Sequence, residues 1–220
     1  MMMNHIFHTQ VAQGWLSVYM DDITIHTKPI PGESEQDHQK RHEALIHLIL
    51  DILEENDLYL KPEKCEFLKT EIDYLGVIIG NNQIKMDPFK LKGIADWVTP
   101  QNPTDIRKFL GFTGYYRYFV PNYSKIARPL LDLTKKATPW LWEPKHKWAF
   151  EELKTRMCAT PVLSQPDFER KFFLQVDASG FGVGAVLSQE SEHTTPTLLK
   201  QQKPTLHPVA YYSATFTPTE

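Results

Sequence analysis

The chain has 220 residues, of which 41% are hydrophobic and 23% charged, and its net charge is −3. This composition is ordinary for a soluble globular chain, no apolar run approaches the ~18 residues of a membrane span, and the first residues lack a signal-peptide pattern. Only Cys65 and Cys158 are present, which excludes a disulfide framework and predicts a reducing compartment with two buried, apolar thiols.

The first predicted element is a β-hairpin around two adjacent aspartates. Residues 16–18 and 23–26 are rich in β-branched side chains and alternate roughly, as strands do. Tyr19-Met20-Asp21-Asp22 lies between them, so both carboxylates are expected at the hairpin tip. Neighbouring carboxylates repel each other unless a cation neutralises them, and hard divalent cations such as Mg²⁺ prefer oxygen ligands. The alternative interpretation is a solvated turn, because turns favour aspartate whatever its role.

A helix and two strands are expected next. Ser34 and Asp37 resemble a capping box, and the apolar residues that follow have helical spacing, which predicts a helix to about Glu55. Its apolar positions are Leu45, Leu48, Ile49 and Ile52. Residues 66–68 and 72–79 are predicted strands, the second of which turns at residues 80–82.

The middle of the chain is predicted to be helical. Helices are expected near residues 88–97, 104–119 and 123–134. Each follows a proline suited to the first turn of a helix: Pro88, Pro103 and Pro121. Trp140 and Trp142 mark a connector before a further helix near residues 145–158. The apolar residues on or near one face of that helix, interpreted as core, are Trp148, Phe150, Leu153 and Met157.

The last part of the chain is predicted to contain strands. Residues 170–178 alternate as a strand, glycines turn the chain, and residues 183–189 form the partner strand. Residues 190–205 are polar and are expected to form a loose loop, followed by a short strand at 209–213.

Positive charge is concentrated in the predicted helices. Residues 88–136 contain nine lysines and arginines against three acidic residues, whereas residues 33–73 contain five against twelve. Aromatic side chains interleave with the basic ones: Trp97, Phe109, Phe112, Tyr115, Tyr116, Tyr118, Phe119 and Tyr123. Such a block suits a phosphate backbone. The alternative is the ordinary solvated face of amphipathic helices.

Six motifs follow one another along the chain. They are Val18-Tyr19-Met20-Asp21-Asp22-Ile23; Tyr74-Leu75-Gly76-Val77; residues 109–119; Pro161-Val162-Leu163 with Asp167-Phe168; Val176-Asp177-Ala178-Ser179 with residues 182–187; and residues 207–213. In this order they resemble the polymerase polyproteins of gypsy-type long-terminal-repeat retrotransposons. The first resembles the palm signature of reverse transcriptases, the second the primer-grip hairpin, the third the thumb, and the last three a ribonuclease H domain and the approach to it.

The resemblance implies an α+β fold in four segments. These are the C-terminal part of a reverse transcriptase palm (1–86), a helical thumb (87–138), a connection (139–168) and the N-terminal part of a ribonuclease H-like domain (169–220). The implied activity of the parent protein is RNA-directed DNA synthesis.

The resemblance also implies site residues. Asp21 and Asp22 match catalytic metal ligands, and Asp21 is the better candidate because adjacent strand residues point to opposite faces. Tyr19 and Met20 would lie beneath the primer end. Asp177 matches the first metal-binding aspartate of ribonuclease H, with an exposed strand-end aspartate as the alternative. The other expected nucleic-acid contacts are Tyr74, Leu75, Gly76, Arg107, Lys108 and Arg117.

The implied cofactor is Mg²⁺, with Mn²⁺ as an alternative. The implied partners are an RNA/DNA primer-template, an RNA–DNA hybrid, deoxynucleoside triphosphates in the intact parent, and the remaining segments of the polyprotein, with no membrane. The expected location is intracellular, cytoplasmic or nuclear, in a virus-like particle for the parent element, and not secreted.

We expect both active sites to be incomplete within these residues. The resemblance places a third palm carboxylate and the fingers before residue 1, and the other ribonuclease H ligands after Glu220. Two neighbouring carboxylates alone hold metal weakly, so the isolated chain is expected neither to polymerise nor to cleave RNA. Two alternatives are a non-catalytic nucleic-acid-binding remnant and a degenerate reading frame that folds only partly.

Histidines in the first quarter of the chain match no zinc-binding pattern. They are His5, His8, His26, His38, His42 and His47. His38 and His42 are four residues apart on the predicted helix, but they lack a third ligand, so no metal site is expected there.

Overall fold

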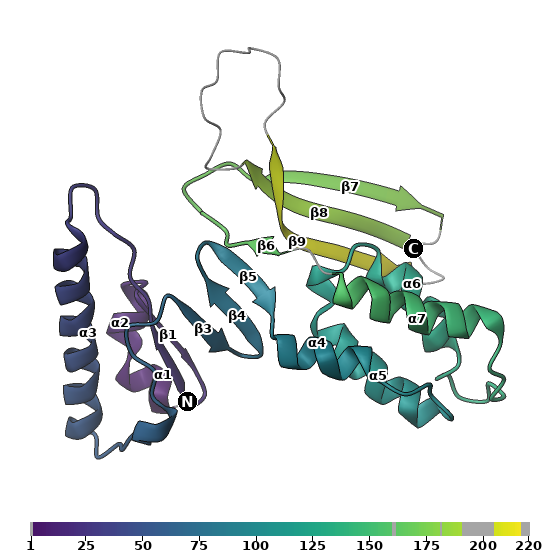
Figure 1. The fold of residues 1–220 in the computed structure, drawn as a ribbon, viewed down its shortest axis with the longest axis horizontal. Coiled ribbons are helices and arrows are strands. Elements are labelled where there is room, and N and C mark those ends of the chain that lie inside the picture. The colour runs from purple at the N-terminus through teal and green to yellow at the C-terminus, as the bar shows by residue number, and fades with distance from the viewer. Residues whose placement is uncertain (1, 160–161, 181, 191–204, 217–220) are drawn as a thin grey trace, which may run out of the picture. The chain divides into compact units, whose positions relative to one another are not determined.

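The computed structural model describes residues 2–159, 162–180, 182–190 and 205–216. The chain divides into two compact units, Met1–Phe67 and Leu68–Glu220. Both contain helices and antiparallel strands (Figure 1), which confirms the predicted α+β class. Among the helices described, none combines the length and the apolar character that a membrane crossing needs.

The first unit is built around one hairpin and one long helix. Its elements are α1 (Met2–Ile6), α2 (His8–Ala12), β1 (Leu16–Tyr19), β2 (Asp22–Ile25), α3 (Glu35–Glu55) and the 3-10 turn η1 (Pro62–Lys64). Four residues from three parts of the unit form its buried core: Phe7, Leu16, Ile49 and Leu53. The apolar side of the hairpin therefore packs with the inner face of α3.

Helix α3 begins and ends where the sequence predicts. The Ser34 hydroxyl accepts a hydrogen bond from the Asp37 amide (3.2 Å) and donates to the Asp37 carboxylate (2.7 Å). This satisfies one of the amides left free at the helix start. The chain leaves the helix after Glu55, and Asp57 adopts a left-handed conformation (φ 54°). Leu48 is exposed, so the inner face is centred on Ile49 and Leu53.

The second unit begins with a four-stranded sheet, and its last strand comes from a distant part of the chain. β3 (Glu71–Tyr74), β4 (Val77–Gly80) and β5 (Gln83–Met86) form an antiparallel meander. β6 (Leu163–Ser164) then pairs with β5, and the Gln165 amide donates to the Asn82 carbonyl at 3.0 Å. The meander is thereby tied to the end of the helical region.

Four helices and one 3-10 turn form the main core of the second unit. They are α4 (Pro88–Ala95), α5 (Pro103–Tyr115), η2 (Arg117–Phe119), α6 (Tyr123–Asp132) and α7 (Pro144–Cys158). Pro88, Pro103 and Pro144 occupy first-turn positions. Side chains from all four helices are fully buried together, among them Ile94, Phe109, Leu130 and Phe150.

The remaining strands form a second, three-stranded sheet. β7 (Phe173–Ser179), β8 (Gly182–Glu190) and β9 (Leu206–Thr215) are antiparallel in the order 7-8-9. The strands predicted near 170–178, 183–189 and 209–213 are all present, and β9 is longer than expected. Most of the loop predicted at 190–205 lies outside the described residues.

Two strand predictions near the start of the second unit are wrong. Residues 66–68 form no strand, because Leu68 is left-handed (φ 56°) and breaks the extended backbone. The strand predicted over 72–79 is in fact β3 and β4, because Leu75 (φ 53°) and Gly76 (φ 80°) turn the chain between them.

Three predictions in the helical region also need correction. Helix α5 ends at Tyr115 rather than near residue 119, and a 3-10 turn follows. Pro121 precedes the cap residue of α6 and so lies outside its first turn. Trp148 is 56% exposed, because it is two residues before Phe150 on α7 and so faces about 200° away from the buried side.

The prediction of two buried thiols is wrong. Cys158 is exposed at the last position of α7, after the buried Met157. Cys65 is partly exposed, and its thiol donates to the Lys61 carbonyl at 3.3 Å.

Candidate nucleic-acid and metal sites

The paired aspartates lie at the tip of the first hairpin. Tyr19 pairs with Asp22, so Met20 and Asp21 form a two-residue turn between the strands. Met20 is held at φ 57°, a conformation that costs an L-residue roughly 1–2 kcal/mol. All four side chains are exposed, including half of Tyr19 and 57% of Met20. The tip therefore presents two carboxylates and two large side chains to solvent.

The two carboxylates occupy different backbone settings. Asp21 lies in the turn, whereas Asp22 is the first residue of β2. Their oxygens are of the kind that Mg²⁺ prefers, and both are accessible. In the described part of the chain, however, no three His, Cys, Asp or Glu side chains gather where a metal could bind. The tip thus offers part of a ligand set for a hard cation.

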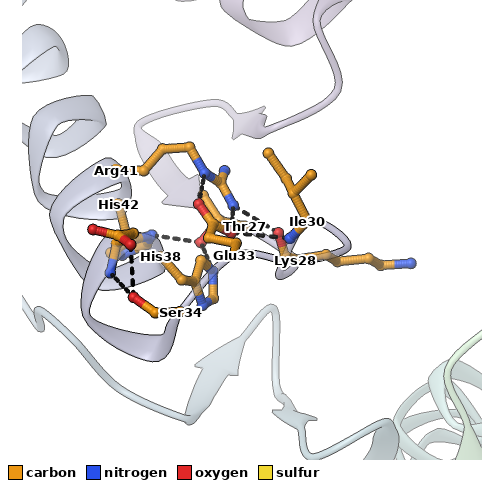
Figure 2. Close-up of polar contacts among 9 residues, drawn as sticks. Thr27, Lys28, Ile30, Glu33, Ser34, His38, Arg41 and His42 are labelled. Carbon is orange, nitrogen blue, oxygen red and sulfur yellow. Dashed lines mark hydrogen bonds and ion pairs between the residues drawn. The ribbon is translucent and has the colours of Figure 1, made fainter.

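A polar cluster attaches the end of this hairpin to α3 (Figure 2). Thr27 follows β2, and its hydroxyl lies 2.8 Å from His38 Nε2 and 3.0 Å from His42 Nδ1. Because a hydroxyl has one proton and two lone pairs, it can accept from both rings, or accept from one and donate to the other. Burial, together with the charges of His38 and Arg41, lowers the pKa of His42 and favours its neutral form. These histidines are therefore structural contacts of the hairpin.

A second contact of the same loop involves Arg41 and Glu33 (Figure 2). Arg41 Nε and Nη2 donate to the two Glu33 carboxylate oxygens at 2.8 and 2.9 Å. Arg41 also donates to the Lys28 carbonyl at 2.7 Å, and the Ile30 amide donates to Glu33 at 2.9 Å. The hydrogen bonds from Arg41 and Ile30 lower the pKa of Glu33 to about 2. The segment between β2 and α3 is thereby fixed at both ends.

The second candidate site is the Leu75-Gly76 turn between β3 and β4. The Tyr115 hydroxyl donates to the Leu75 carbonyl and the Tyr116 hydroxyl to the Gly76 carbonyl, at 2.5 and 3.0 Å. An open cavity of about 560 Å³ lies at this contact. It is lined by Leu75, Gly76, Lys90, Trp97, Lys108, Gly111, Phe112, Tyr115 and Tyr116. Two lysines and exposed aromatic surface therefore meet beside the turn.

The structure brings together some of the contacts expected from the sequence and separates others. Leu75, Gly76 and Lys108 line one cavity, and Tyr74 ends the adjoining strand β3. Arg107 instead donates to the Thr134 carbonyl at 3.1 Å. Arg117 donates to the Tyr118 hydroxyl at 3.0 Å, with its guanidinium 5.0 Å from that ring centre.

The expected set of contacts omitted Lys90, Tyr115 and Tyr116. In the sequence, all three are distinguished only as members of the basic and aromatic region 88–136. The adjacent tyrosines at a predicted helix were the available signal, but their partner turn is 40 residues away in the sequence.

Asp177 lies within β7, opposite Gly184 of β8. Its side chain is exposed, and it belongs to no metal-binding group among the residues that the structure describes. It supplies one accessible carboxylate in a strand, whereas the hairpin tip supplies two.

Comparison with known proteins matches the two ends of the chain to two protein families. Residues 1–79 match the family model "Reverse transcriptase (RNA-dependent DNA polymerase)", and residues 142–220 match "RNase H-like domain found in reverse transcriptase". The chain belongs to the reverse transcriptase and ribonuclease H region of retrotransposon polyproteins. Both families use divalent metals, which agrees with the oxygen ligands exposed in the two matched segments.

Two relatives of this retrotransposon region align over most of the chain. The retrovirus-related Pol polyprotein from transposon 297 of Drosophila melanogaster is 37% identical over 214 residues, which cover 97% of the chain and 18% of the relative. The transposon Tf2-3 polyprotein of Schizosaccharomyces pombe is 35% identical over 196 residues, 89% of the chain and 13% of the relative. The chain thus spans less than a fifth of the length of these curated relatives.

Solved structures support the fold of the same region. The foamy viral protease-reverse transcriptase in complex with RNA/DNA hybrid matches with a TM-score of 0.76 at 23% identity, over 99% of this chain and 27% of that one. A structure of that protein with double-stranded DNA matches with a TM-score of 0.72, over 98% and 42% of the two chains. This similarity supports the α+β fold of the chain.

Proposed function

We propose that this chain is part of the RNA-directed DNA polymerase of a gypsy-type long-terminal-repeat retrotransposon. The observation that carries the proposal is the exposed Tyr19-Met20-Asp21-Asp22 hairpin tip within a reverse transcriptase segment, followed by a ribonuclease H-like segment. The proposed segments are the end of the palm (1–86), the thumb (87–138), the connection (139–168) and the start of the ribonuclease H domain (169–220).

In this proposal Asp21 is a direct ligand of Mg²⁺ or Mn²⁺, and Asp22 lies more peripherally. The exposure of both carboxylates and their place at a hairpin tip support this role. A divalent metal bound there would lower the pKa of the primer 3′-hydroxyl and neutralise charge on the incoming triphosphate. Tyr19 and Met20 lie beside the primer end and fix its position. Asp177 is the corresponding first ligand of the ribonuclease H site.

The Leu75-Gly76 turn and the two lysines of its cavity are proposed to contact the primer strand. Lys90 and Lys108 supply positive charge, and Tyr115, which is 57% exposed, supplies an aromatic surface. Phosphate binding by such lysines is favourable because it releases condensed counterions. The foamy viral relatives of this fold were solved with double-stranded DNA and with RNA/DNA hybrid, which supports a duplex as partner.

The other proposed partners are deoxynucleoside triphosphates and the remaining segments of the polyprotein. The proposed location is inside the cell, within the virus-like particle of the element. Arg107 and Arg117 are proposed as secondary contacts, because each already donates a hydrogen bond within the protein.

Binding to an RNA–DNA hybrid tests this proposal. We expect the purified chain to bind with an affinity that falls as salt rises, and Lys90→Gln with Lys108→Gln to reduce the salt slope by about one per lysine. Lys147→Gln, an exposed lysine on α7, is the matched control and should leave the slope unchanged. Equal binding by the double variant and the control would exclude this surface as the interface.

A non-catalytic nucleic-acid-binding remnant is the second candidate function. It is favoured by one observation: in the described residues, neither the hairpin tip nor Asp177 belongs to a group of three potential metal ligands. This candidate predicts the same hybrid binding but no dependence of any activity on Asp21.

A further inference from the structure

The turn between β3 and β4 has both of its carbonyl oxygens occupied. Leu75 and Gly76 have positive φ (53° and 80°), as in the turn type that two-residue hairpins favour. The Tyr115 hydroxyl donates to the first carbonyl and the Tyr116 hydroxyl to the second. Neither turn amide donates to a backbone acceptor among the described residues. The turn therefore keeps its donors available while its acceptors are bound.

The two tyrosines reach the turn from the end of α5. Tyr115 is the last residue of the helix and Tyr116 its cap, and their rings meet edge to face with centres 4.9 Å apart. Tyr116 is 3% exposed, and burial raises the pKa of its hydroxyl. It is thus a neutral donor fixed in the core, whereas Tyr115 is 57% exposed.

Gly76 fits closely against Tyr116. A Cβ added at residue 76 would lie 3.1 Å from the Tyr116 hydroxyl, and the φ of 80° already disfavours any side chain. The turn and the end of α5 are therefore matched in shape as well as in hydrogen bonding.

We propose that Tyr115 and Tyr116 are positioning residues that hold the Leu75-Gly76 turn in the orientation that receives the primer strand. This inference rests on the proposed function of the turn. A free carbonyl beside a phosphate would repel it. A carbonyl that accepts a hydrogen bond from a tyrosine hydroxyl carries less exposed negative charge and leaves the turn amides to face the strand. The same bonds couple the last hairpin of the palm to the first long helix of the thumb.

The test compares Tyr115→Phe, Tyr116→Phe and the double variant with Tyr212→Phe. Each substitution removes only a hydroxyl. The control residue is an exposed tyrosine of the same unit, on strand β9. Because Tyr115 is largely exposed, its variant is expected to fold even if the buried Tyr116→Phe does not. Two quantities are measured for each variant. They are its affinity for an RNA–DNA hybrid across a salt series and the hydrogen-exchange rates of the amides of residues 71–80.

We expect each tyrosine variant to bind about 3- to 10-fold more weakly, as for the loss of one hydrogen bond. The salt slope should be unchanged because the lysines remain. Exchange should accelerate in residues 71–80 and not elsewhere, and the control should match the wild type. The positioning role is wrong if the variants bind the hybrid with wild-type affinity, or if the amide hydrogens of the turn exchange no faster than in the wild type. The proposed function would then still stand. If the wild-type chain does not bind the hybrid, the proposed function fails and this inference with it.

Discussion

Ser124 of α6 and Ser213 of β9 hold each other through three hydrogen bonds. The Ser124 amide donates to the Ser213 hydroxyl at 2.9 Å, the Ser124 hydroxyl donates to the Ser213 carbonyl at 2.7 Å, and the two hydroxyls are 3.1 Å apart. Beside them, a Cβ added at Gly184 of β8 would lie 2.9 Å from the Asn122 side-chain oxygen. The β7-β8-β9 sheet and helix α6 are therefore fitted to each other within the second unit.

This contact predicts energetic coupling between the two serines. Ser213→Ala leaves the partly buried Ser124 amide without its acceptor and should lower the free energy of unfolding by about 1–3 kcal/mol. Ser124→Ala should cost a similar amount. In a denaturant-based double-mutant cycle the two losses should add incompletely, because both variants remove the hydrogen bond between the two hydroxyls. Strictly additive losses would show that the two hydroxyls are not energetically coupled.

Thr27 provides a second test, in the first unit. Thr27→Val keeps the shape of the side chain but removes the hydroxyl between His38 and His42. We expect a loss of about 1–2 kcal/mol and faster hydrogen exchange in the hairpin and the start of α3. The control is Thr24→Val, in the middle of β2. If the two variants exchange alike, the Thr27 hydroxyl does not anchor the hairpin.

Acidification should loosen the same cluster. The pKa of His42 is lowered in the folded chain, so below the usual value near 6.5 the unfolded state binds more protons. The stabilisation from neutral His42 is therefore present above pH 6.5 and is lost as the pH falls through the folded pKa. The pKa of His26 is lowered too, mainly by burial, and acts in the same direction.

Hydrogen exchange of residues 27–42 between pH 7.5 and 5, corrected for intrinsic rates, measures this effect. Protection should fall with pH in the wild type and fall less in His42→Gln, whereas His47→Gln should behave as the wild type does. Glu33 has a separate effect on stability. The stabilisation from its ionised carboxylate is present above pH 4.5 and is lost as the pH falls towards its folded pKa of about 2. Constant protection down to pH 5 would contradict the assignment for His42.

The hairpin and α3 were predictable because their signals are local. Alternating β-branched residues flank Tyr19–Asp22, and Ser34 lies three residues before its capping partner. The strand break at Leu75-Gly76 has no such local signal, because the apolar run continues through it. Only the resemblance of its motif to the primer-grip hairpin indicates a turn there.

The contacts that complete the second unit join residues far apart in the sequence. Strand β6 pairs with β5 about 80 residues earlier, and Ser213 bonds Ser124 from 89 residues away. No periodicity or spacing in the sequence encodes such pairings. The sequence therefore indicates which residues are chemically suited to bind nucleic acid, but not which of them lie side by side in the fold. Lys108 lines the cavity, whereas its neighbour Arg107 donates a hydrogen bond to the carbonyl of Thr134, just after α6.

The purified 220-residue chain should show neither primer extension nor cleavage of an RNA–DNA hybrid in Mg²⁺. Asp21 and Asp22 form a pair, Asp177 stands alone, and no described group of three ligands surrounds either site. Two-metal chemistry needs more oxygen ligands than these. Extension that persists through purification and disappears in Asp21→Asn would show that the chain holds a complete site.

The most direct test of the account is primer extension by the complete protein encoded by the reading frame in which these residues lie. Wild type and Asp21→Asn are compared on an RNA template with a DNA primer in Mg²⁺, together with their affinity for the hybrid. Loss of even an outer partner of a metal ligand costs about 10- to 100-fold, so loss of Asp21 should reduce extension at least about 100-fold. Hybrid affinity should stay within about twofold, because Lys90 and Lys108 are unchanged. Equal extension by both proteins would contradict the role of Asp21, and hybrid binding without any extension would identify the chain as a nucleic-acid-binding remnant.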